Sequence, residues 1–153
     1  GQGFISSMAF GNGGTSVDPT GIITYLTPNS TGTNASLYNQ TFTKIVDDRS
    51  VSNLDPQRNK IETRHVNGTN YTDVVVTCLL DYGEPNGQDA TDTASASDSL
   101  YVFDELGLTS YASSGTGKLL THVIFHPVQK SLNRLIQIDY TVRVQSLTGF
   151  NEG

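Results

Sequence analysis

The side chains with which this sequence could do chemistry are three histidines and a few carboxylates. His122 and His126 are four residues apart, so they share one face of an extended strand, and His65 could join them as a third zinc ligand. Zinc sites usually bring Cys or carboxylate ligands at closer spacing. We therefore expect the histidines to be polar residues packed at an interface, and we predict no metal and no other cofactor.

Catalytic motifs are incomplete in this chain. Asp104 and Glu105 are adjacent and would point to opposite faces of a strand, so they cannot act together as an acid–base pair. The glycine-rich segment 114–119 superficially resembles a phosphate-binding loop, but Ala112 and Leu119 stand where the motif needs Gly and Ser or Thr. No signature of a nucleophile elbow is present in the sequence. These failures predict that the protein is not an enzyme.

The segment 86–99 contains no apolar residue larger than alanine. Its three aspartates lack the Asp-x-Asp-x-Asp-Gly order of a calcium loop. A polar connection of this length is unusual inside a domain and is often functional. We interpret it as a loop ordered by a partner and cut by proteases when free, with candidate contact residues Gln88, Asp89, Asp92 and Asp98.

Composition limits the possible partners. The 153 residues are expected to form one domain, 1–153, and they carry nine Lys and Arg against 15 Asp and Glu, a net charge of −6. Nucleic-acid binding needs clustered basic residues, which this sequence lacks. No apolar run is long enough to predict a membrane span, and no signal peptide is apparent.

Strict alternation is the clearest structural signal. Between Ile136 and Gln145 apolar residues occupy every second position, which predicts a strand with one face on a core. Its other face meets water or a partner, with candidate contact residues Gln137, Asp139, Thr141 and Arg143. The segment 71–81 is apolar on both faces and predicts a central strand that buries Cys78.

Shorter strands are predicted at 4–10, 21–26, 37–46, 60–66, 101–108 and 119–125. Turn signals separate them, and Asn67-Gly68 could form a hairpin because both residues tolerate positive φ. Pro127 predicts that the strand from Leu119 ends before it. We expect an all-β, single-domain antiparallel sandwich or partly open barrel of seven or eight strands with long polar loops.

Three segments give the chain a likeness to known proteins: 4–15 (FISSMAFGNGGT), 101–108 (YVFDELGL) and 119–144. With Leu37-Tyr38-Asn39, they resemble small virion structural proteins of tailed bacteriophages, particularly tail-fibre and baseplate assembly domains. Those domains carry Gly-Asp-Gly-Gly-like and Glu-Ile-Gly-Leu-like elements. Here Asn12 and Leu106 replace the Asp and the Ile.

The resemblance implies a non-enzymatic protein of the virion that docks onto neighbouring subunits in the tail, baseplate or neck. Its partners would be other virion proteins and copies of itself, with no nucleic acid and no membrane. Gly11, Gly13 and Gly107 are expected to adopt backbone conformations closed to other residues.

Two alternative functions remain open. The first is a capsid cement or decoration protein, because similar small β-rich chains serve there. The second, from another class, is a secreted carbohydrate-binding β-sandwich. Five Asn-x-Ser/Thr sequons and seven tyrosines fit it, but the absence of tryptophan weakens sugar stacking and the single cysteine excludes an internal disulfide.

Overall fold

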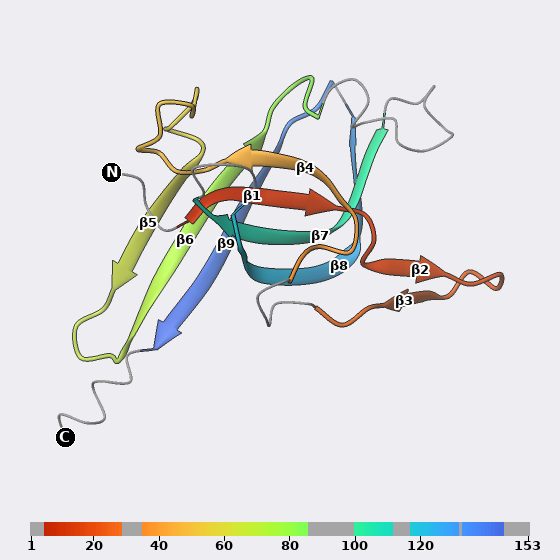
Figure 1. Ribbon diagram of the computed structural model, residues 1–153, viewed down its shortest axis with the longest axis horizontal. Helices are drawn as coiled ribbons and strands as arrows, with labels where there is room; N and C mark the ends of the chain where they lie inside the picture. Colours follow the sequence, from red (N-terminus) through yellow and green to blue (C-terminus); the bar gives the residue numbers. More distant parts are fainter. Residues whose placement is uncertain (1–4, 29–34, 86–99, 112–116, 132, 146–153) are drawn as a thin grey trace.

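The computed structural model describes residues 5–28, 35–85, 100–111, 117–131 and 133–145. These residues form nine strands (Figure 1): β1 (Ile5–Gly11), β2 (Thr15–Val17), β3 (Ile23–Tyr25), β4 (Gln40–Ile45), β5 (Lys60–His65), β6 (Tyr71–Leu80), β7 (Leu100–Ser110), β8 (Leu119–Ser131) and β9 (Ile136–Gln145). Within the same ranges no helix is long and apolar enough to cross a membrane.

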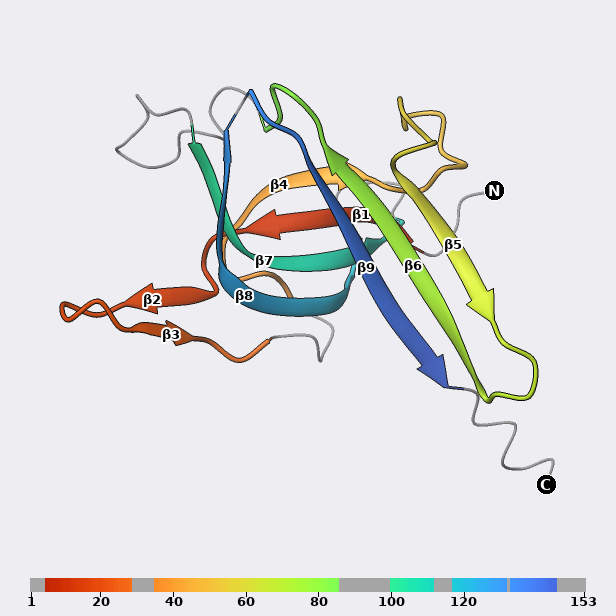
Figure 2. The ribbon, with the colours of Figure 1, turned by 180° about the vertical axis from the view of Figure 1, so that it is seen from behind.

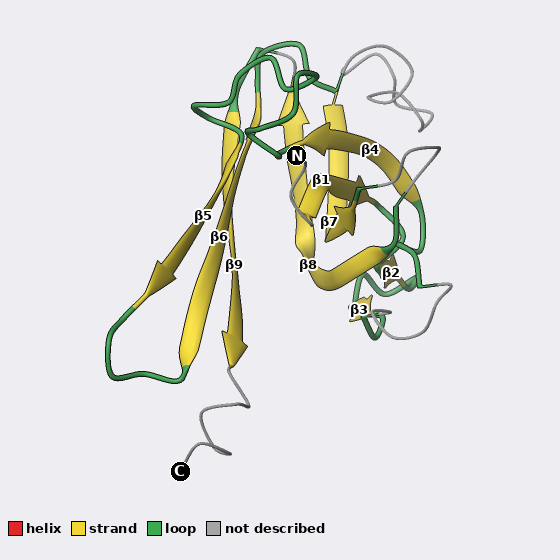
Figure 3. Ribbon diagram, turned by 60° about the vertical axis from the view of Figure 1, so that its left-hand side comes forward, coloured by secondary structure: helices red, strands yellow, loops and turns green. Residues whose placement is uncertain are grey.

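Every strand pair is antiparallel, and the strands form two main sheets and one separate hairpin. One sheet has the order β4-β1-β7-β8 and the other the order β5-β6-β9, while β2 pairs only with β3. The two sheets face each other as layers, with their strands running in different directions (Figures 2 and 3). The sheets pack together without closing into a barrel, which confirms the predicted all-β fold class.

The core lies between these sheets. Met8 and Phe10 of β1 and Leu106 and Leu108 of β7 belong to the same buried cluster as the β6 side chains that face them. Phe103 packs edge-on against Phe10, with ring centroids 5.3 Å apart. Each fully buried side chain of this size stabilises the fold by about 1.5–3 kcal/mol, so this aromatic and aliphatic layer holds the two sheets together.

The three-stranded sheet follows the predicted pattern. β9 spans the predicted range, and its apolar side chains from Ile136 to Val142 are half-buried while the residues between them are exposed. β6 lies between β5 and β9, and Val76, Cys78 and Leu80 are fully buried. Both predictions, a half-buried strand and a central strand that buries Cys78, are confirmed.

The turn between β5 and β6 confirms the predicted hairpin. Gly68 has φ of 89°, which only glycine adopts without strain, and the Thr69 amide donates to the Val66 carbonyl at 3.2 Å. The chain reverses here and pairs Lys60–His65 with Tyr71–Leu80 in antiparallel register.

One local expectation is wrong, and one short strand was not predicted. β8 continues past Pro127 to Ser131, because its register with β7 shifts between the pairs Phe103↔Val128 and Glu105↔Ile124. The shift gives β8 two extra residues and removes Pro127 from the paired positions, where its missing N–H would break the ladder. β2, which the sequence did not predict, is a strand of only three residues.

Candidate interaction surfaces and the buried node that holds them

A buried carboxylate joins three distant segments of the chain. Glu105 of β7 is fully enclosed, and its Oε1 accepts a hydrogen bond from the Tyr38 amide at 2.9 Å and lies 2.8 Å from His122 Nε2. Its Oε2 accepts from the amides of Gly13 and Asn39, both at 2.9 Å. A carboxylate only accepts hydrogen bonds, so the His122 nitrogen that faces it carries the proton.

Asp104, the neighbour of Glu105, binds the same turn one residue further along. It is 3 % exposed, and its Oδ1 accepts from the Gly14 amide at 2.8 Å. Its Oδ2 accepts from the amide and the hydroxyl of Thr15, at 3.0 and 2.5 Å. We call Asp104, Glu105 and His122, with the backbone amides that they bind, the buried acid node.

The node unites the segments that carry the resemblance: the turn after β1, the residues around Tyr38, and the element beginning at Asp104. Short motifs in the sequence indicated these segments one by one. No pattern in the sequence predicted that Asp104 and Glu105 both bind the turn that follows β1. The expectation of unusual backbone conformations at Gly11, Gly13 and Gly107 is wrong. Positive φ occurs in the described residues at Gly21, Gly68 and Gly83.

Close packing explains the glycines at positions 11, 13 and 107. A Cβ on Gly13 would lie 2.8 Å from Tyr38 Cβ and 2.9 Å from the Asn39 nitrogen. A Cβ on Gly11 would lie 2.5 Å from the Asn39 carbonyl oxygen and 2.6 Å from Glu105 Oε2. A Cβ on Gly107 would lie 2.6 Å from the Thr121 carbonyl oxygen. These three positions therefore need glycine because neighbouring atoms approach the backbone closely, and Gly11 and Gly13 lie at the node itself.

The node has no route for a substrate, since the side chains of Glu105 and His122 are completely enclosed. His122 is thus a packed polar residue, but it lies inside the chain and not at the predicted interface, and His126 is exposed. His65 on β5 instead lies 3.1 Å from the Tyr71 carbonyl oxygen. Among the described residues no three His, Cys, Asp or Glu side chains are grouped so that they could hold a metal ion.

Outside the node, the hairpin of β2 and β3 extends away from both sheets (Figures 1 and 2). We call residues 15–27 the arm. Its base is closed by the Leu26 amide donating to the Gly14 carbonyl at 2.8 Å and by the Tyr38 hydroxyl donating to the Thr27 carbonyl at 2.5 Å. Because Gly14 and Tyr38 are also bound by the node, the arm is fixed to the core at its base.

The arm is unusually apolar for an exposed element. Val17 and Ile22 are each 62 % exposed, Tyr25 is 50 % and Leu26 is 39 % exposed. Asp18 is the only charged residue between positions 15 and 27. Its carboxylate accepts hydrogen bonds from the amides of Thr20 and Ile22, at 2.9 and 3.0 Å, which fixes the turn.

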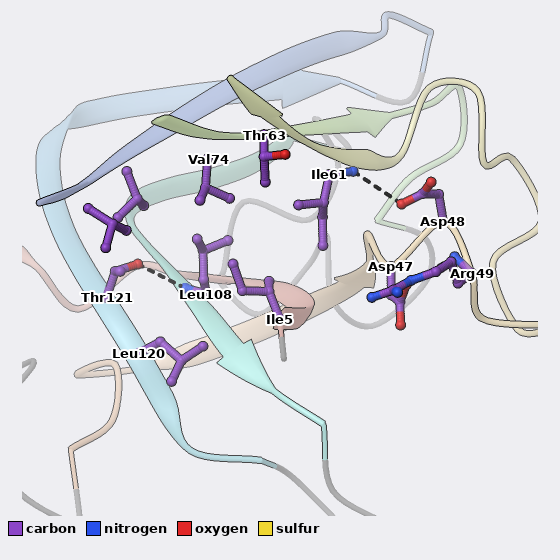
Figure 4. A pocket seen from close by; sticks show the side chains of 12 residues that line it. Ile5, Asp47, Asp48, Arg49, Ile61, Thr63, Val74, Leu108, Leu120 and Thr121 are labelled. Carbon is purple, nitrogen blue, oxygen red and sulfur yellow. Dashed lines mark hydrogen bonds and ion pairs between the residues drawn. The ribbon is translucent and has the colours of Figure 1, made fainter. Parts of the chain in front are cut away.

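A second apolar surface lies where the two sheets diverge. This apolar groove has a volume of about 730 Å³, and Figure 4 shows side chains of both sheets pointing into it. Its apolar lining is Ile5, Ile61, Val74, Leu108, Leu120, Val142 and Val144. Asp47 and Arg49 lie at one end, 3.7 Å apart, and Asp48 there accepts a hydrogen bond from the Ile61 amide.

The predicted contact residues of β9 share one exposed face, as the alternation required. Gln137, Asp139 and Thr141 line a shallow concave surface of about 480 Å³ with the polar side chains of β5. The side chain of Arg143 instead binds other residues of the same chain. Its Nε donates to Asp73 at 2.9 Å, and its guanidinium lies 3.8 Å from the centre of the Tyr71 ring.

The Arg143–Asp73 pair shifts the pKa of both groups. The hydrogen bond from Arg143 lowers the pKa of Asp73, and the same bond raises the pKa of Arg143. The other predicted contact residues, Gln88, Asp89, Asp92 and Asp98, lie outside the described residues.

No family model matches this chain, and neither a curated protein nor a solved structure is significantly similar to it.

Proposed function

We propose that this chain is a non-enzymatic structural protein of a bacteriophage virion, which docks onto neighbouring subunits of the tail, baseplate or neck. One observation carries the proposal: the arm extends from the body and exposes Val17, Ile22 and Tyr25 by half or more. An isolated two-stranded hairpin is marginal in water, and exposed apolar side chains on it gain most by burial against another protein.

The way in which the arm is attached supports the same proposal. The buried acid node holds Gly14 and Tyr38, and these residues close the base of the arm. An element that is anchored at its base and apolar at its surface is suited to binding a partner in a defined direction. The segments that resemble phage assembly domains thus serve here to present the arm.

The chemistry of the node also favours assembly over catalysis. Each carboxylate oxygen of Asp104 and Glu105 already accepts hydrogen bonds from the chain, and the His122 side chain is enclosed. Groups that are saturated and buried in this way stabilise a conformation and do not meet a substrate.

The experiment is to locate the protein on particles of the phage that encodes it. Antibodies against the purified chain, coupled to gold, are applied to intact particles and viewed by electron microscopy. We expect label on the tail, baseplate or neck. Label over the head surface would replace this location with the capsid-decoration alternative, and absence of the protein from purified particles by mass spectrometry would overturn the proposal.

A further inference from the structure

We propose that the arm of one copy binds in the apolar groove of a second copy of this chain, so that copies associate head to tail. The proposal rests on the proposed assembly function and names the partner of the arm. It starts from two apolar surfaces that the described residues leave exposed on one chain: the projecting arm and the apolar groove.

The two surfaces match in chemistry. The arm exposes Val17, Ile22, Tyr25 and Leu26, and seven of the twelve described residues that line the groove are apolar. Burial of these side chains against one another removes apolar surface from water on both sides, at about 25 cal/mol per Å². A groove of about 730 Å³ has the size of pockets that enclose several large apolar groups.

Charge opposes this pairing only weakly, because the arm carries one negative charge and the charged residues of the groove, Asp47, Asp48 and Arg49, sum to −1. Copies with a net charge of −6 repel one another, and the arm carries only Asp18. Within the groove, Asp48 is hydrogen-bonded to the chain, and Asp47 accepts from the Arg49 amide at 3.0 Å. Insertion of the arm therefore desolvates few charges that lack a partner.

The geometry excludes insertion of the arm into its own groove. Ile5 at the start of β1 lines the groove, and Gly11 at its end leads into the turn that carries the arm. Seven extended residues separate the two by about 20 Å. The arm then points further away from the groove, on the opposite side of the molecule (Figures 1 and 2).

An arm and a groove at opposite ends form a heterologous contact. Each copy then uses its arm on one neighbour and its groove on the other, so the contacts either close into a ring or continue as a filament. Both arrangements are suited to a subunit that repeats around or along a particle axis.

Cross-linking between two single-cysteine additions tests the contact directly. The variants Ile22→Cys, on the arm, and Val144→Cys, at the groove, are mixed and treated with a bismaleimide that has a flexible spacer. Both positions are at least half exposed, and the native Cys78 is fully buried, so only the added thiols react. Circular dichroism and melting curves verify that each variant is folded.

Tyr82→Cys provides the matched control, because Tyr82 is 62 % exposed, as Ile22 is, but lies in the turn after β6. We expect the Ile22→Cys and Val144→Cys mixture to give at least tenfold more heterodimer than Tyr82→Cys with Val144→Cys. A yield no higher than the control would overturn the arm-in-groove contact. If gold label nevertheless locates the protein on the virion, the assembly function stands and only this partner is wrong.

Discussion

At the residue scale, the most demanding feature is the enclosed Glu105. Burial of a carboxylate is costly unless its oxygens are satisfied, and here three backbone amides and His122 Nε2 bind it. The stability of the node therefore depends strongly on the charge and the acceptor capacity of the Glu105 side chain, beside the separate hydrogen bonds that Asp104 accepts.

Glu105→Gln should lower the free energy of unfolding by about 2–4 kcal/mol, because the amide nitrogen of Gln cannot accept the hydrogen bonds that Oε1 or Oε2 accepts. Urea denaturation measures the change. Glu62→Gln is the control, since the Glu62 side chain is 45 % exposed and its nearest cation is 4.0 Å away. Equal stabilities of the two variants would show that the node contributes little.

Cys78 has the opposite role, that of an apolar residue. It is fully buried between the sheets, and burial raises the pKa of its thiol to about 12. Only about one thiol in ten thousand is ionised at pH 8, so a thiol reagent should label the native protein very slowly and the unfolded protein quickly.

Cys78→Ser should lower the free energy of unfolding by about 1–3 kcal/mol, measured by urea denaturation, because it buries a hydroxyl among apolar side chains. Rapid labelling of the native protein would contradict this packing.

At the scale of elements, the arm turn depends on the ionisation of Asp18. The hydroxyl of Thr20, and after it the amide of Ile22, donate to the carboxylate and lower the pKa of Asp18 below its ordinary value of 3.8. A lowered pKa means that the contribution to the folded turn is complete above pH 3.8 and is lost as the pH falls through the lower, folded value.

Amide chemical shifts measured by NMR between pH 6 and pH 2 test this dependence. The Thr20 and Ile22 amides should shift with a midpoint below 3.8, while the amides of Val76 and Cys78, which are buried in β6 away from Asp73, stay in place until the whole protein unfolds. In Asp18→Asn the same two amides should show no such transition. A midpoint at or above 3.8 in the unmodified protein would contradict the hydrogen-bonded turn.

Periodicity predicted the long strands well because their burial is decided locally. The alternation in β9 and the apolar run in β6 each reflect which face of a strand meets the core. The sequence did not predict β2, because three residues are too few to show an alternation of apolar and polar side chains. β8 escaped prediction past Pro127 because the register shift that accommodates proline depends on its pairing with β7.

The site was harder to predict than the fold, for a physical reason. The sequence identified the exposed face with Gln137, Asp139 and Thr141, which follows from period two alone. The buried acid node joins residues 13, 38, 105 and 122, and the arm is exposed because no other strand of the described residues pairs with it. Both are long-range properties that appear only when the sheets are assembled.

At the scale of the whole molecule, the chain has a well-packed centre and two apolar surfaces that its described residues leave uncovered. The core holds the two sheets together, the node directs the arm, and the groove opens where the sheets diverge. These features together are typical of a subunit whose surface is completed by its neighbours.

Sedimentation velocity over a wide range of protein concentration tests that description most directly. We compare the unmodified chain with the triple variant Val17→Ser, Ile22→Ser and Tyr25→Ser, which removes three exposed apolar side chains from the arm and leaves the core unchanged. The unmodified chain should associate as its concentration rises, and the variant should sediment as a monomer of about 16.5 kDa throughout. Identical sedimentation of the two proteins at every concentration would contradict the claim that copies of the chain associate through the arm.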